Sequence, residues 1–185
     1  MINTQLGGKF SREENGLFDL RKHLISSGIN IEFPFSDGIV GEYKGIGVTF
    51  IPTPERTFYD IEIEFFNAIR INPVHIVHNK FKDQIGYIGE SASIELGYAI
   101  MHNRPIIFLY EPTFSEKVSP IIKELINANV ELIKIKRLDL LSTDEVSDYV
   151  STIVTDPIEY LLKVTSEVEV MKIVGNLLDS YKETN

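Results

Sequence analysis

One glutamate stands apart in this sequence because it is surrounded by apolar residues. The segment 86–109 reads GYIGESASIELGYAIMHNRPIIFL, and we predict that a helix spans 91–102 within it. Glu95 is the only formally charged residue of that helix. A helix that is apolar on nearly all sides is usually buried, and an ionised carboxylate inside one costs several kcal/mol unless it is paired. We therefore interpret Glu95 as a carboxyl group held at the mouth of a cleft.

Three structural explanations of Glu95 remain open beside this functional one. It could be the third residue of a helix capping box, but such a box has Ser or Thr three residues earlier, where this chain has Ala92. It could be a core glutamate paired with Lys9, Arg70 or Arg104. It could also reach solvent from a narrow exposed stripe of the helix.

The composition narrows the class of protein and of partner. With 185 residues, of which 43% are apolar and 24% charged, the chain resembles one ordinary globular domain, plus at most an appendage. A net charge of −9 argues against nucleic acid or an anionic membrane surface as a partner. The absence of cysteine excludes a thiolate nucleophile and a disulfide framework. The N-terminus lacks an apolar signal core and no apolar run approaches ~18 residues, so we expect a cytoplasmic protein with a small-molecule ligand and no membrane contact.

The histidines do not form a metal-binding pattern. His75 and His78 lie three residues apart in a predicted strand, so their side chains point to opposite faces of it. His102 lies near a helix C-terminus, where a cation is favourable without any function. We therefore assign no histidine to catalysis and expect no metal or redox cofactor.

Short apolar strands alternate with helices along the chain. We predict strands at 2–6, 29–35, 74–79, 106–110 and 130–135. We predict helices that begin at a Ser11–Glu14 capping box, at Thr53-Pro54, near Ser91 and at Ser119-Pro120, and the first of them ends at Gly28. Glycines among aromatic and β-branched residues indicate a hairpin or flap between 36 and 53.

This alternation predicts an α/β fold over residues 1–137, with an open five-stranded parallel sheet and helices on both faces. In such sheets, ligands bind beyond the carboxyl ends of the strands, at the point where the strand order reverses. If the order is 2-1-3-4-5, that point lies between the first and third strands. Gly7-Gly8 and the loop 79–91 then face each other there, and Glu95 falls on the predicted cleft.

The pattern changes after Arg137, where we predict a C-terminal helical extension over 138–185. Ser142 and Glu145 have the spacing of a capping box, and Asp156-Pro157 indicates the start of a second helix. The apolar stripes of these helices must be buried, either against the sheet of the same domain or in an oligomer interface. The sequence leaves both possibilities open.

The residues around Glu95 also resemble a known family. The run Glu95-Leu96-Gly97-Tyr98-Ala99, followed by Arg104-Pro105 and a β run, resembles the ELGYA-type motif of the nucleoside 2-deoxyribosyltransferases and related nucleotide N-glycosidases. The run Gly86 to Ser91 looks like the same region of a less characterised branch. The resemblance covers roughly residues 1–135 and implies a flavodoxin-like sheet, a homo-oligomer whose subunits complete one another's sites, and Glu95 as the nucleophile.

The implied chemistry is attack of Glu95 on the anomeric carbon to give a covalent glycosyl-enzyme, without a metal or redox cofactor. The departing base needs a group that protonates it or donates a hydrogen bond to it, and the candidates are Glu90, Tyr87 and Asp60. The family has an aspartate about six residues before the nucleophile, where this chain has Gly89 followed by Glu90. It has a second aspartate on the preceding helix, where Asp60 or Glu64 would have to stand in.

The predicted substrate-binding residues are Gly7, Gly8, Lys9, Gly86, Gly89 and Ser91. Glycines allow close approach of the backbone to a ligand, and the helix that follows Ser11 has free N–H groups that attract anions. Lys9 is the only cation of that loop, so a phosphate could dock there, or the loop could be a plain turn with a solvated lysine. Three functions stay open: transfer, hydrolysis of a nucleoside 5′-monophosphate or an NAD-like dinucleotide, and non-catalytic nucleotide binding or assembly.

Overall fold

The computed structural model describes residues 2–9, 16–43 and 46–164. Its centre is a five-stranded parallel sheet made of β1 (Ile2–Gly8), β2 (Ile29–Ile31), β5 (His75–His78), β9 (Ile106–Phe108) and β11 (Ile133–Ile135). Each of these strands overlaps the range predicted for it. The predicted α/β class with a parallel sheet is therefore confirmed.

The order of strands across the sheet is β2-β1-β5-β9-β11. When all strands of the described residues are numbered along the chain, this order is 2-1-5-9-11, which differs from the predicted 2-1-3-4-5. The numbers differ because six short strands in this part of the chain lie between the strands of the sheet in sequence and pair outside it. β1 lies between β2 and β5, and its last residues Gly7 and Gly8 are in register with Val77 and His78. The end of β1 is therefore held against the end of β5.

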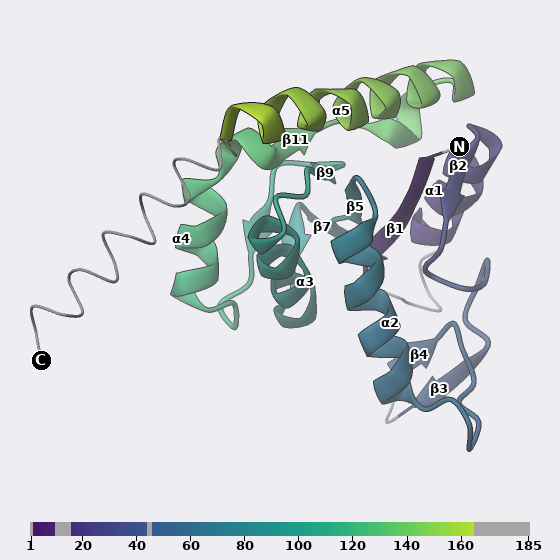
Figure 1. Cartoon of the computed structure of the whole chain (residues 1–185). Helices are drawn as coiled ribbons and strands as arrows, with labels where there is room; N and C mark the ends of the chain where they lie inside the picture. Colours follow the sequence, from purple (N-terminus) through teal and green to yellow (C-terminus); the bar gives the residue numbers. More distant parts are fainter. Residues whose placement is uncertain (1, 10–15, 44–45, 165–185) are drawn as a thin grey trace, which may run out of the picture.

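Helices cover both faces of the sheet (Figure 1). α1 (Gly16–Ser26) and α5 (Thr143–Val164) lie on one face, and α2 (Phe58–Ile71), α3 (Glu90–Met101) and α4 (Pro120–Ala128) lie side by side on the other. Each face has its own hydrophobic core, because side chains alternate along a strand. Ile76 of β5 joins the core under α1 and α5, whereas Val77 joins the core under α2, α3 and α4.

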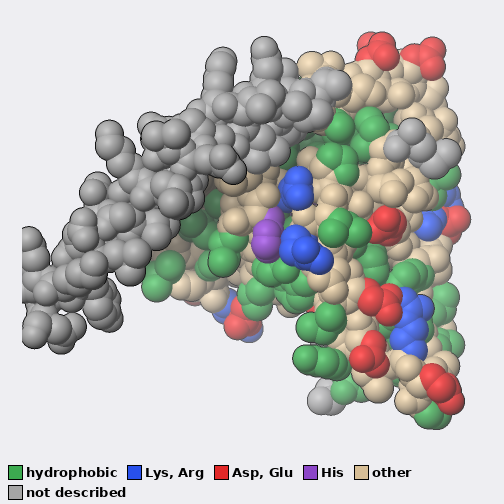
Figure 2. Space-filling view, in the orientation of Figure 1, with side chains coloured by type: hydrophobic (Ala, Val, Ile, Leu, Met, Phe, Trp, Pro, Cys, Tyr) green, Lys and Arg blue, Asp and Glu red, His purple; other side chains and the backbone are tan. Residues whose placement is uncertain are grey.

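Helix α3 is less buried than we predict from its apolar sequence. Its inner side is buried at Leu96, Gly97 and Ile100, but Ile94 is 56% exposed and Met101 is 75% exposed. Figure 2 shows hydrophobic side chains on this face of the molecule. The prediction of a helix buried on nearly all sides is wrong for one side, because α3 packs between its neighbours and the sheet and keeps an outer edge open.

Helix α2 begins later than predicted. Thr57 is its N-cap: the Thr57 hydroxyl accepts from the Asp60 N–H at 3.3 Å, and the Asp60 carboxylate accepts from the Thr57 N–H at 2.7 Å. This capping box satisfies N–H groups that a start at Thr53-Pro54 would leave to solvent. Thr53 instead pairs with Arg56 through its backbone. The predicted start of α4 at Ser119-Pro120 is confirmed, and the Ser11–Glu14 capping box lies outside the described residues.

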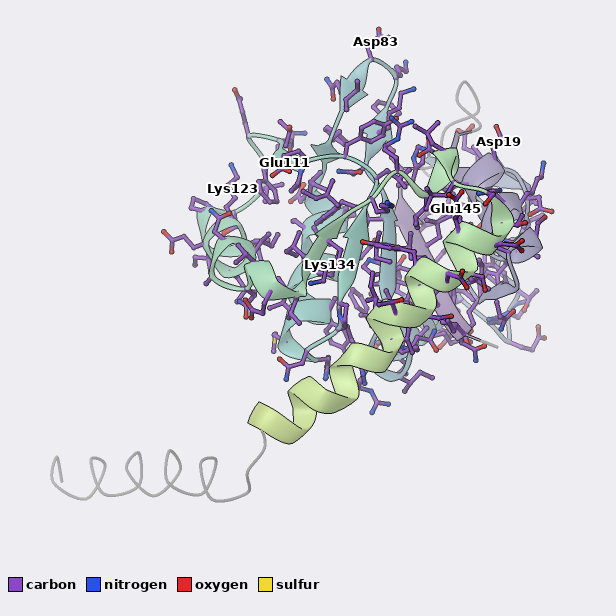
Figure 3. The ribbon with its side chains drawn as sticks, turned by 90° about the horizontal axis from the view of Figure 1, so that it is seen from above. Asp19, Asp83, Glu111, Lys123, Lys134 and Glu145 are labelled. Carbon is purple, nitrogen blue, oxygen red and sulfur yellow. The ribbon has the colours of Figure 1, made fainter. Side chains whose placement is uncertain are left out.

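The C-terminal extension begins with the predicted capping box. The Ser142 N–H donates to Glu145 at 2.8 Å, and Figure 3 shows Glu145 at the end of α5 that lies near α1. Val146 and Val150 are buried in the core below, so this part of the extension covers the sheet of its own domain. The predicted second helix start at Asp156-Pro157 is wrong, because α5 runs without interruption from Thr143 to Val164.

The short strands form three two-stranded pairs outside the main sheet. β3 (Gly41–Tyr43) and β4 (Ile46–Val48) form the hairpin predicted between 36 and 53. β6 (Lys80–Phe81) pairs with β7 (Gln84–Ile85), and β8 (Tyr87–Ile88) with β10 (Thr113–Phe114); the sequence did not predict these pairs. Figure 3 shows Asp83 at the tip of the β6–β7 hairpin, which projects from the body. Single 3₁₀ turns at Val130–Leu132 and Leu138–Leu140 complete the elements, and no helix within the described ranges is long and apolar enough to span a membrane.

Candidate functional site

A pocket of about 110 Å³ opens at the carboxyl end of β1, on the α2 and α3 side of the sheet. Apolar and aromatic side chains form most of its wall, and two carboxyl groups and the backbone of two glycines complete it. It is lined by Leu6, Gly7, Gly8, Phe33, Pro34, Phe35, Thr49, Ile61, Glu62, Phe65 and Glu95. Three residues singled out from the sequence, Gly7, Gly8 and Glu95, therefore meet in one pocket.

Glu95 projects from α3 toward the end of β1, and its side chain is 18% exposed. Its Oε2 atom is buried and has no hydrogen-bond partner. A Cβ atom at Gly7 would lie 2.7 Å from this oxygen, so any larger residue there would displace the carboxyl group from this position. Burial, together with a smaller contribution from the nearby charge of Glu62, raises the pKa of Glu95 to about 8.

This placement excludes two of the three structural explanations of Glu95. Arg104 donates to the backbone carbonyl of Arg70, and the Lys9 ammonium lies 3.8 Å from the ring centroid of Phe81. Among the described residues, the only basic group within 4 Å of the carboxyl group is the imidazole of His75. Glu95 is therefore neither a capping residue nor a core glutamate neutralised by lysine or arginine.

His75 is the first residue of the site that the sequence analysis missed. It lies on β5 next to Gln5 of β1, and its Nε2 atom lies 3.8 Å from Glu95 Oε2. The ring is fully buried, and burial lowers the pKa of His75 to about 4. The prediction that His75 and His78 point to opposite faces of the strand is confirmed, since His78 lies on the α1 side of the sheet. The neighbour of His75, Glu95, comes instead from helix α3, which is distant in the sequence.

Glu62 is the second missed residue, and it supplies the second carboxyl group of the pocket. Its side chain is exposed, and the partial shielding of its carboxyl group from water raises its pKa above the ordinary value. The sequence analysis considered Asp60 and Glu64 instead, because they lie one turn apart. Glu62 directly follows Ile61, which belongs to the apolar face of α2, and this position at the edge of the buried face was the available signal.

The other predicted catalytic residues lie outside this pocket. Asp60 forms the capping box of α2 with Thr57, and Glu64 forms an ion pair with Arg56. Glu90 is exposed at the first position of α3. The Tyr87 ring is 5.9 Å from that of Phe81, and its hydroxyl lies beside Gly89.

Most of the predicted substrate-binding residues also lie outside this pocket. Gly86 has φ +79° and packs against the backbone of Glu111, so it serves the β8–β10 pair. Gly89 is the N-cap of α3, and Ser91 is exposed in its first turn. Lys9 is exposed beside the β6–β7 hairpin. Of this predicted set, only Gly7 and Gly8 line the pocket among the described residues.

Three aromatic rings contribute to the wall of the pocket. The Phe33 ring lies 4.5 Å from Phe35 and 5.3 Å from Phe65, as measured between centroids. The Arg56 guanidinium lies over Phe35, 4.9 Å from its centroid. This arrangement suits a flat, uncharged ring that stacks on aromatic groups and donates hydrogen bonds to carboxyl oxygens.

A larger pocket of about 230 Å³ lies on the α1 side of the sheet. His23, His78, Lys80 and Asp139 are among its lining residues. Two of these groups have partners: Arg137 donates to Asp139 at 2.8 Å, and a His23 ring nitrogen lies 3.0 Å from the Leu141 carbonyl oxygen. We therefore place the candidate site at the smaller pocket, which holds the buried carboxyl group of Glu95.

Comparison with protein-family models gives no match for this chain, and comparison with curated proteins gives none either.

Proposed function

We propose that this chain transfers the sugar of a nucleoside or nucleotide from one base to another, through a covalent glycosyl-enzyme on Glu95. One observation carries the proposal: a carboxyl group lies beside an aromatic-walled pocket, with Gly7 making room for it and Glu62 nearby. The resemblance of Glu95 to Ala99 to the ELGYA-type motif of nucleoside 2-deoxyribosyltransferases supports the same function. We also propose that the sheet is flavodoxin-like and that the protein forms a homo-oligomer.

The proposed first step forms a bond between Glu95 Oε1 and C1′ of the sugar while the N-glycosidic bond breaks. The electron pair of that bond leaves with the base nitrogen, which takes a proton from the carboxyl group of Glu62. A second base then attacks C1′ through its ring nitrogen, the ester bond to Glu95 breaks, and the carboxylate of Glu95 is restored, while the Glu62 carboxylate takes the N–H proton of the incoming base and becomes the acid again. Water in place of the second base gives hydrolysis.

Attack requires the ionised carboxylate of Glu95. Because the pKa of Glu95 is raised to about 8, most molecules hold the acid at pH 7. Because the step also needs the protonated carboxyl group of Glu62, whose pKa is raised above its ordinary value, we expect a bell-shaped profile in which the rate falls by about tenfold per unit well above pH 8. An exposed carboxylate would already be fully ionised at pH 6, so this profile is specific to the buried group.

The test is incubation of the full chain with a deoxynucleoside and a different free base, with the products separated by chromatography. A new nucleoside supports transfer, free sugar supports hydrolysis, and binding without turnover supports a non-catalytic module. Glu95→Gln should abolish turnover, and the matched control Glu124→Gln, at an exposed position of α4, should leave it unchanged. Intact mass measured with the deoxynucleoside alone should increase by one sugar residue in the wild type and not in Glu95→Gln.

A further inference from the structure

A continuous chain of polar side chains runs through the interior from Glu32 to Glu95. The Asn72 Nδ2 atom lies 3.0 Å from Glu32 Oε2 and 3.1 Å from Gln5 Oε1. The Gln5 Nε2 atom lies 3.1 Å from His75 Nδ1, and His75 Nε2 faces Glu95 Oε2 at 3.8 Å. Gln5, Asn72 and His75 are all buried. Buried polar groups are retained only when hydrogen bonds satisfy them, so their alignment needs an explanation.

The direction of each hydrogen bond in this chain follows from its Glu32 end. A carboxylate only accepts hydrogen bonds, so the Asn72 amide must present its NH₂ group to Glu32. The same NH₂ group has a second hydrogen for Gln5 Oε1, and Gln5 must therefore present its own NH₂ group to His75. His75 Nδ1 then accepts. A neutral imidazole carries one N–H, so its proton lies on Nε2.

We infer that His75 is a positioning residue that presents its Nε2–H to Oε2 of Glu95, and that Gln5, Asn72 and Glu32 hold it in the tautomer that can do so. The distance of 3.8 Å exceeds that of a hydrogen bond, and neither atom has another hydrogen-bond partner. The two atoms form no hydrogen bond while Glu95 holds its proton. The hydrogen bond forms when the carboxyl group ionises, because a charged acceptor binds an N–H more strongly than a neutral acid does.

This contact has two consequences for the carboxyl group. It favours the ionised form, and it occupies Oε2 so that Oε1 is the oxygen left to react. Two described ionisable groups, His75 from β5 and Glu62 from α2, influence the charge of Glu95, and Glu62 opposes its ionisation. The role in catalysis rests on the proposed function, whereas the tautomer of His75 does not.

The tautomer can be measured directly on the full chain. Long-range proton–nitrogen correlation spectra distinguish Nδ1–H, Nε2–H and imidazolium, and the signal of His75 among the four histidines is assigned by its loss in His75→Gln. We expect a neutral ring with the proton on Nε2 between pH 6 and 8. An Nδ1–H tautomer, or an imidazolium in this range, would overturn the inference. This result holds whether or not the protein shows glycosyl transfer.

The coupling to Glu95 is tested by titrating its carboxyl carbon in two variants. His75→Phe removes the donor, and we expect the pKa of Glu95 to rise by about one unit, the equivalent of a weakened charge-assisted hydrogen bond. His75→Gln keeps an N–H and should show a smaller rise. In the active enzyme, the pH–rate profile should move by the same amount while KM stays the same. Equal pKa values of Glu95 in the wild type and His75→Phe would refute the contact, and if His75→Phe does not fold, the tautomer of the wild type decides alone.

Discussion

The burial of Glu95 predicts a specific dependence of stability on pH. The pKa of Glu95 is raised from 4.5 to about 8 in the folded protein, so the folded state keeps a proton that the unfolded chain loses above pH 4.5. The stability contributed by the protonated group is complete below pH 4.5 and is lost as the pH rises toward 8. Replacing Glu95 by glutamine removes this loss, because an amide of the same shape does not ionise.

The effect of Glu95 on the free energy of unfolding can be measured separately from that of His75 between pH 6.5 and 8. His75 acts in the opposite sense, since its pKa is lowered from 6.5 to about 4, but its contribution is constant above pH 6.5. From pH 6.5 to 8, Glu95 therefore lowers the free energy of unfolding by about 2 kcal/mol, at about 1.4 kcal/mol per pKa unit. At pH 8, Glu95→Gln should be more stable than the wild type by about 4 kcal/mol, because the stability that the wild type has already lost between pH 4.5 and 6.5 adds to this difference.

Urea denaturation followed by circular dichroism at both pH values measures the effect. The wild type and the control Glu124→Gln should lose the same stability, and Glu95→Gln should lose about 2 kcal/mol less. Equal losses in Glu95→Gln and the wild type would show that Glu95 is already ionised when folded. That outcome would refute the interpretation that burial keeps Glu95 protonated in the folded protein.

Four further predictions follow from the same contacts. Gly7→Ala places a Cβ atom 2.7 Å from Glu95 Oε2, and we expect a loss of about 1–3 kcal/mol in the free energy of unfolding together with most of the turnover, measured by denaturation and by the transfer assay. Thr57→Ala should cost about 1 kcal/mol of stability without changing turnover, because it removes only the cap of α2. Residues 38–52 should exchange their amide hydrogens rapidly and become protected when a ligand binds, whereas strong protection in the free protein would make them ordinary sheet edge. If a phosphate docks after β1, a nucleoside monophosphate should bind more tightly than its nucleoside and Lys9→Ala should erase most of the difference; equal affinities in the wild type would exclude this contact.

The elements of the fold could be predicted from the sequence because local patterns determine them. Alternating apolar runs predict the five strands of the sheet, and the capping box at Ser142 and the proline after Ser119 predict two helix starts correctly. Local patterns gave the wrong helix start at Thr53, because Thr57 four residues later is the actual N-cap. They also predicted a helix start at Pro157, where α5 continues without a break. Glu95 could be singled out for the same local reason, since one charge in an apolar helix is visible without a structure.

The partners of Glu95 depend on tertiary structure alone. His75 is separated from it by twenty positions and Glu62 by more, and the strand register and helix packing bring all three to the end of β1. Asp60 was a reasonable candidate by type, but a rotation of two residues around α2 places Glu62 on the pocket and leaves Asp60 to cap the helix. The sequence by itself determined which group is costly to bury. The packing of α2 and β5 against α3 decided which side chains lie beside that group, because contacts between distant segments leave no pattern in the local sequence.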